Sequence, residues 1–233
     1  MSKDNLKYYT YQLDMKVLNI LAILLFLVIV VVMYLVKYNF QEIVEYNMFI
    51  LFILLFLWLM FHEVLHGIGF ALFKEVKLSN IVFGMALEKG VFYCMCKQKI
   101  SKKVIFTSLL FPVTIIGIFT LILGIIINNS LLVYLSIFNI VGSIGDIVMS
   151  IYFSRCPGDV IYLDLDDCTS FTVLSSNDIS NIKIPGIMLV DSGKYNSKME
   201  ALDRRKLVIS KTSWCVMIII FILILINILG GVL

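Results

Sequence analysis

The stretch that decides the fold is residues 48–73, which read MFILFILLFLWLMFHEVLHGIGFALF. Apart from His62, Glu63 and His66, this run contains no ionisable side chain. A membrane-spanning helix needs about 20 consecutive apolar residues, because the hydrocarbon core is about 30 Å thick and a helix rises about 1.5 Å per residue. The segment therefore predicts a membrane-spanning helix that carries three polar residues inside it.

Four further segments are apolar and long enough to cross a bilayer. With the first, they give five predicted spans: Val17–Val36, Met48–Phe73, Val104–Ile127, Leu131–Phe153 and Ser213–Leu233. Composition agrees, since 61% of the residues are hydrophobic and only 15% are charged, against about 25% charged in soluble domains. Backbone groups in lipid must be satisfied within the segment, so helices are expected. The sequence thus predicts an all-α polytopic membrane protein with about five transmembrane helices and small β-segments in its cytoplasmic loops.

These spans divide the chain into four expected parts. They are a polar N-terminal tail (1–16), a membrane core of four helices (17–154) with a surface β-segment at about 78–100, a loop or small domain (155–212) and a fifth transmembrane helix (213–233). No small-residue cleavage site follows the first span, which is therefore interpreted as an uncleaved helix and not as a signal peptide. Pro112, inside the third span, predicts a kink.

The charge of the loops predicts the orientation in the membrane. Residues 74–103 contain seven lysines and two glutamates, which gives a net charge of +5. Loops rich in Lys and Arg stay on the cytoplasmic side. We therefore expect a multi-pass protein of the cell membrane, with the N-terminus and the 155–212 segment cytoplasmic and the C-terminus outside. The expected surroundings are the lipid bilayer, with no nucleic-acid partner, and the oligomeric state stays open.

Only four Asp, Glu, Lys, Arg or His residues fall within the five predicted spans: His62, Glu63, His66 and Asp146. Placing a charge at the centre of a bilayer costs about 2.5–3.5 kcal/mol on insertion scales, so such residues indicate function. His62 and His66 are four residues apart on one helical face, and both imidazoles can reach one ion. Glu63 can reach a water at that ion without binding the ion itself. This is the H-E-x-x-H pattern of zinc metallopeptidases.

A catalytic zinc usually has three protein ligands, and Asp146 is the candidate for the third. His62 lies 14 residues into its span from Met48, and Asp146 lies 15 residues into its span from Leu131. If both spans run in the same direction, the two side chains lie at nearly the same depth. Weaker candidates for the third ligand, at or beyond the membrane edge, are Asp159, Asp164, Cys94 and Cys96.

These residues resemble the intramembrane zinc metallopeptidases of the site-2 protease type. More narrowly, the chain resembles a small bacterial membrane-protein family described as putative zincin peptidases. The resemblance rests on His62-Glu63-Val64-Leu65-His66-Gly67 in one helix and on Asn139 followed by Asp146 in a later one, and it covers roughly residues 48–154. Site-2 proteases carry a proline between the Asn and the Asp and a glycine after the Asp, whereas this chain has no proline there and Ile147 follows. The resemblance implies that Asn139 contacts substrate, although a polar contact between helices is an equal alternative.

The expected function is hydrolysis of peptide bonds in a membrane protein or peptide substrate. Zn²⁺ would be held by His62, His66 and Asp146, and Glu63 would be the general base. Two alternatives from other classes stay open. A metal-ion transporter can carry a similar motif in a membrane helix, although this chain has no third histidine. A non-catalytic metal-binding scaffold is the other, but it would not need Glu63.

Overall fold

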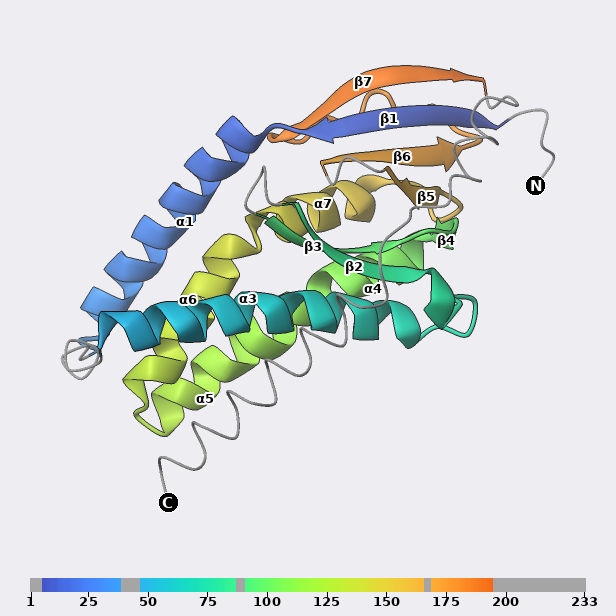
Figure 1. Ribbon diagram of the computed structural model, residues 1–233. Coiled ribbons are helices and arrows are strands. Elements are labelled where there is room, and N and C mark those ends of the chain that lie inside the picture. The colour runs from blue at the N-terminus through green and yellow to red at the C-terminus, as the bar shows by residue number, and fades with distance from the viewer. Residues whose placement is uncertain (1–5, 39–46, 87–90, 166–168, 195–233) are drawn as a thin grey trace.

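Figure 1 shows the computed structural model, in which residues 6–38, 47–86, 91–165 and 169–194 are described. Within these ranges, three helices are long and apolar enough to cross a membrane. They are α1 (Met15–Leu35), α3 (Met48–Ala71) and a continuous helix Lys102–Ile126. The last is made of α4 (Lys102–Pro112), a π-helix, η4 (Val113–Phe119), and α5 (Thr120–Ile126). The predicted fifth span, 213–233, lies outside the described residues.

Polar caps begin the first two long helices where the apolar runs start. The Asp14 side chain accepts from the N–H groups of Lys16 and Val17, and the Asn47 side chain accepts from the N–H of Phe49. These caps satisfy N–H groups that have no partner inside the helix. Many apolar side chains of α1 face outward, and Val28 is 60% exposed. Such a surface is stable when lipid, and not water, covers it.

The fourth predicted span, 131–153, is not one straight helix. It is divided into α6 (Ser130–Gly142) and α7 (Ile144–Arg155), which meet at an angle of 52°. At the break, the Ser143 hydroxyl donates to the Asn139 carbonyl at 2.6 Å. A serine that bonds back to the preceding turn bends a helix, and the neighbouring Gly142 and Gly145 weaken it further. The break sets the direction in which α7 leaves α6.

The prediction of an all-α fold is wrong, because seven strands occur in the described part of the chain. Five form an antiparallel sheet in the order β4-β5-β6-β1-β7. Their bounds are β1 (Lys7–Leu13), β4 (Ile100–Ser101), β5 (Ile161–Asp164), β6 (Ser170–Ser175) and β7 (Ile187–Lys194). The N-terminal segment, expected to be only a polar tail, supplies β1. Its alternating Tyr9 and Tyr11 are buried, as one face of a strand requires.

The other two strands form the β-segment expected near 78–100. A short 3₁₀ turn (Leu78–Asn80) leads into β2 (Ile81–Ala86), which pairs with β3 (Val91–Cys96) so that Phe83 lies opposite Cys94. This hairpin lies against α3 at the histidine motif. A Cβ atom at Gly67 would lie 2.2 Å from the Phe83 ring, so only glycine at this position lets the hairpin approach so closely.

An aromatic cluster joins the five-stranded sheet to α7. The ring centroids of Tyr11 and Tyr152 are 4.9 Å apart, those of Tyr11 and Phe171 are 5.5 Å apart, and those of Phe153 and Tyr162 are 5.6 Å apart. Tyr152 and Phe153 belong to α7, and the others belong to β1, β5 and β6. Buried aromatic pairs of this kind stabilise a fixed geometry. The sheet therefore holds α7, the helix that carries Asp146, in a defined position.

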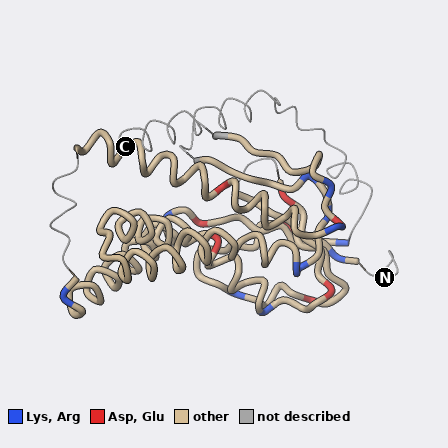
Figure 2. The backbone as a smooth tube through the Cα atoms, turned by 90° about the horizontal axis from the view of Figure 1, so that it is seen from below, with Lys and Arg blue, Asp and Glu red and all other residues tan. Residues whose placement is uncertain are grey.

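The strand pairing also brings together segments that lie far apart in the sequence. β1 precedes α1, β4 lies between α3 and α4, and β5 to β7 follow α7, yet all belong to one sheet. In Figure 2, most Lys and Arg positions gather at one end of the molecule, and the helical part is largely without them. The segments before α1, between α3 and α4, and after α7 thus each contribute to one sheet.

Candidate metal centre

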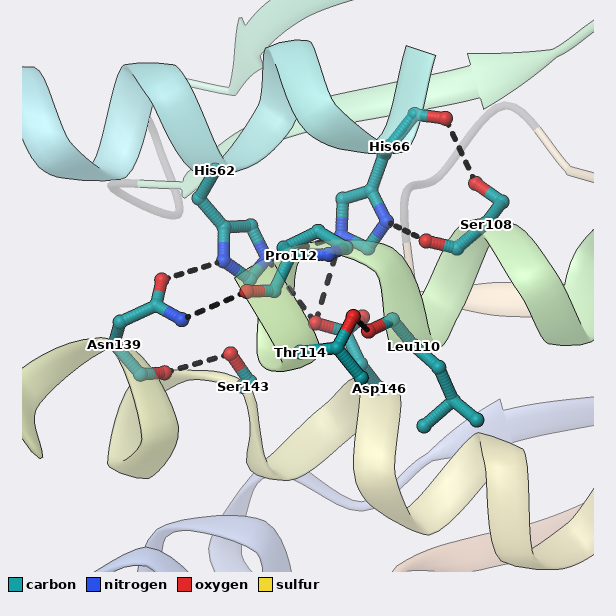
Figure 3. Close-up of polar contacts among 9 residues, drawn as sticks. All are labelled: His62, His66, Ser108, Leu110, Pro112, Thr114, Asn139, Ser143 and Asp146. Atoms are coloured by element: carbon teal, nitrogen blue, oxygen red, sulfur yellow. Dashed lines mark hydrogen bonds and ion pairs between the residues drawn. The ribbon is translucent and has the colours of Figure 1, made fainter. Parts of the chain in front are cut away.

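The two histidines of the chain meet on the inner face of α3. His62 and His66 are 8% and 7% exposed, and their Nε2 atoms are 3.0 Å apart. Their four-residue spacing places one ring above the other on the same helical face. Figure 3 shows both rings directed from α3 toward the break between α6 and α7.

Asp146 reaches the same point from the first turn of α7. Its Oδ2 atom lies 3.1 Å from Nε2 of His62 and 3.5 Å from Nε2 of His66. The bend at Ser143 turns this helix so that its N-terminal turn faces α3. The N-terminus of a helix favours a negative charge, which helps to hold a carboxylate in this buried place. Residues 84 positions apart in the sequence, His62 and Asp146, are therefore adjacent in space.

The outer nitrogen of each ring has its own partner. Nδ1 of His66 lies 2.8 Å from the carbonyl of Ser108, and Nδ1 of His62 lies 2.8 Å from Oδ1 of Asn139. The Asn139 amide nitrogen donates to the Pro112 carbonyl in a longer contact of 3.4 Å, which assigns the orientation of the amide. Both partners of the histidines are acceptors, so each Nδ1 carries a proton. Each Nε2 is left with its lone pair directed at the centre.

Three electron-pair donors thus converge with no protein cation among them: two imidazole nitrogens and a carboxylate oxygen. Gathering such groups in a buried place is costly unless a positive charge lies between them. Two imidazoles and a carboxylate are a known donor set for catalytic zinc, which keeps a further position open. The described residues therefore fit a zinc ion.

Glu63 also lies at this centre. The ligand atoms of His62, Glu63 and His66 all lie within 4.8 Å of one another, so Glu63 competes with Asp146 as a third donor by distance alone. Asp146 is in direct contact with both Nε2 atoms, whereas Glu63 and Cys94 of β3 line the same cavity beside them. Glu63 therefore lies between the centre and the hairpin.

A cavity of about 230 Å³ opens beside the two rings. It is lined by groups from both sides of the site, among them Glu63, Cys94, Asp146, Tyr162 and Asp164. A larger hollow of about 530 Å³ lies on the opposite face of α3, beside Val64, Ile68 and Phe83. That hollow has no ionisable lining residue, so the smaller cavity is the one suited to chemistry.

The structure brings together four of the predicted site residues and places the fifth behind them. His62, Glu63, His66 and Asp146 surround the centre, and Asn139, which is 2% exposed, contacts His62 from outside it. A role for Asn139 in binding substrate stays a prediction. Sequence reasoning missed the carbonyl of Ser108. Pro112, four residues further along the same helix, indicates this contact, because proline has no N–H to donate to the Ser108 carbonyl.

Asp164, a weaker candidate in the sequence, lies in the cavity wall and links the two sheets. Its carboxylate accepts from the Tyr162 hydroxyl and, at 2.8 Å, from the N–H of Cys96. Burial raises the pKa of Asp164 to about 6, although both hydrogen bonds act in the opposite direction. Burial also raises the pKa of the Tyr162 phenol well above its usual value, so its hydroxyl stays a donor.

The raised pKa of Asp164 predicts a pH-dependent stability. The unfolded pKa is about 3.9, so between about pH 4 and pH 6 the folded state binds more protons, and this group lowers the free energy of unfolding as pH rises. Asp164→Asn removes that contribution. In the absence of zinc, the melting temperature of Asp164→Asn should rise relative to that of the original protein between pH 4 and pH 6. A stability difference between Asp164→Asn and the original protein that stays constant over this pH range would contradict the assignment.

Comparison with known proteins agrees with this site. Residues 54–161 match the model of a protein family described as "Putative zincin peptidase", and this range includes both histidines, Glu63, Asn139 and Asp146. The expected resemblance to that family is confirmed over this part of the chain. Searches among curated proteins and among solved structures gave no match. The likeness to site-2 proteases stays a prediction.

Proposed function

We propose that this protein is a membrane-embedded zinc endopeptidase that hydrolyses membrane-associated substrates. The observation that carries the proposal is the convergence of two Nε2 lone pairs and the Asp146 carboxylate beside Glu63. In this proposal His62, His66 and Asp146 hold the zinc, and the family match supports a peptidase.

The chemistry then divides between the ion and one side chain. Bound zinc supplies Lewis acidity, which polarises a carbonyl and lowers the pKa of water toward about 7. The Glu63 carboxylate accepts the proton of the attacking water and later delivers it to the leaving amine. The acceptors Asn139 and Ser108 orient the Nδ1 sides of His62 and His66, which leaves both Nε2 atoms facing the proposed ion. The enclosing helices limit the access of bulk water.

The edge of β3 suggests how a substrate is held. The Cys96 N–H donates to Asp164 and therefore points away from β2. Alternate residues of a strand direct their N–H groups to the same side, so the Cys94 N–H also points toward the cavity. We propose that a locally unwound substrate lies extended along this edge, in the manner of an added strand. Its scissile carbonyl then passes close to Glu63.

The proposed orientation in the membrane rests on the sheet and on charge. The sheet joins the N-terminal strand, the segment after α3 and the segment after α7. The segment after α3 has the +5 charge that favours the cytoplasmic side. We therefore propose that the sheet and the cavity opening face the cytoplasm, and that substrates enter from that side.

A single preparation tests the proposal. Protein purified in detergent is analysed for bound metal and incubated with synthetic single-span peptides that carry a fluorophore and a quencher. We expect about one zinc per chain and cleavage that a chelator stops and added zinc restores. Absence of cleavage, together with zinc flux into vesicles that contain the protein, would favour a transporter instead.

A further inference from the structure

Pro112 lies inside the long helix Lys102–Ile126, where it removes one backbone hydrogen bond. In an α-helix, the N–H of residue 112 would donate to the carbonyl of residue 108. Proline has no N–H, so the Ser108 carbonyl loses its partner within the helix. A backbone carbonyl without a partner is costly inside a membrane, and another group normally satisfies it.

The group that satisfies this carbonyl is the ring of His66. Its Nδ1 donates to the Ser108 carbonyl at 2.8 Å, and the Ser108 hydroxyl donates to the His66 carbonyl at 2.9 Å. Ser108 is 1% exposed, so water does not compete for these contacts. Gly69 allows the two helices to approach this closely, because a Cβ atom there would lie 2.7 Å from Cα of Ser108.

We propose that Pro112 is a positioning residue for the metal centre, acting through the Ser108 carbonyl that it frees to hold His66. The inference rests on the proposed zinc site. A carbonyl oxygen can only accept, so it keeps the proton of His66 on Nδ1 and the lone pair of Nε2 directed at His62 and Asp146. Outer partners of metal-binding histidines typically change metal affinity by about 10–100-fold.

The test is Pro112→Ala, which returns an N–H that competes with His66 for the Ser108 carbonyl. We expect zinc affinity, measured by competition with a chromophoric chelator, to fall by about 10–100-fold. Pro185→Ala makes the same substitution at an exposed turn and should have no effect.

A spectroscopic readout separates positioning from a general structural role. The chain has only two histidines, so ¹⁵N-histidine labelling of the zinc-loaded protein gives two Nδ1–H signals. Pro112→Ala should move one of them, that of His66, toward a weaker hydrogen bond. Asn139→Leu, which removes the partner of His62, should move the other. Pro112→Val returns the same N–H with a larger side chain and takes the place of Pro112→Ala if that variant does not fold.

The outcomes are distinct. If Pro112→Ala binds zinc as tightly as the original protein and leaves both Nδ1–H signals in place, Pro112 has no positioning role, even though the zinc site stands. If the original protein binds no zinc, the proposed function fails first. Lower affinity with a shift of the His66 signal alone supports the proposal.

Discussion

Glu63→Gln should remove most of the peptidase activity and leave the zinc bound. The substitution keeps the size and the hydrogen-bonding oxygen of the side chain but removes its capacity to accept a proton. The histidines and Asp146, which contact one another directly, are unchanged. Loss of a general base typically slows a reaction by about 10²–10⁴-fold. Cleavage of single-span peptides and bound zinc, measured on the same sample, check both parts.

The matched control for this prediction is Glu75→Gln. Glu75 is exposed and accepts from the Ser101 hydroxyl outside the site, so the same change of charge there should leave cleavage intact. Undiminished cleavage in Glu63→Gln would show that Glu63 is not the base. Loss of zinc in Glu63→Gln would instead assign Glu63, which lies within 4.8 Å of both histidines, to the ligands.

Removing the histidines should release the metal. His62→Ala and His66→Ala each delete one of the two Nε2 donors, and the chain has no other histidine to replace it. We expect zinc affinity to fall by more than about 100-fold in each variant, since loss of even an outer partner costs about 10–100-fold. Metal analysis after dialysis is the measurement. Stoichiometric zinc in the double variant would refute the site.

Asp146→Asn tests the third ligand with a smaller change. It keeps the shape of the side chain but removes the charge that faces both rings, so we expect weaker zinc binding together with lower activity. Asp159→Asn is the control, because Asp159 is exposed and accepts from the Ser176 hydroxyl away from the centre. Equal zinc affinity in Asp146→Asn and the original protein would show that Asp146 is not the third ligand.

The parts of the site that lie on one helix could be predicted from the sequence. The spacing of His62 and His66 is a property of the α-helix, and the apolar run around them predicts that helix without further information. Matching depths in two spans also pointed to Asp146. Asp146 does lie beside both rings, since the rise per residue is regular and the break at Ser143 comes only three residues before Asp146.

The predictions that were wrong concern segments whose structure depends on pairing between distant parts of the chain. In the sheet, β1 lies between β6 and β7, and both of these strands come much later in the sequence. Each strand is also short. The segment Lys7–Leu13 alternates weakly and is followed at once by a membrane helix, so its composition favoured a polar tail. Only the packing of Tyr11 against Tyr152 and Phe171 makes a strand there stable.

By itself, then, the sequence determined the apolar helices and the H-E-x-x-H face, because helical geometry and the cost of charge in lipid act locally. The tertiary structure decided the sheet, the bend at Ser143 and the partners of the two histidines. Hydrogen bonds such as that from His66 to Ser108 join helices whose approach depends on packing across the whole domain. No local sequence pattern predicts the distance between these helices, although Pro112 indicates the helix turn in which the Ser108 carbonyl lacks a helical partner.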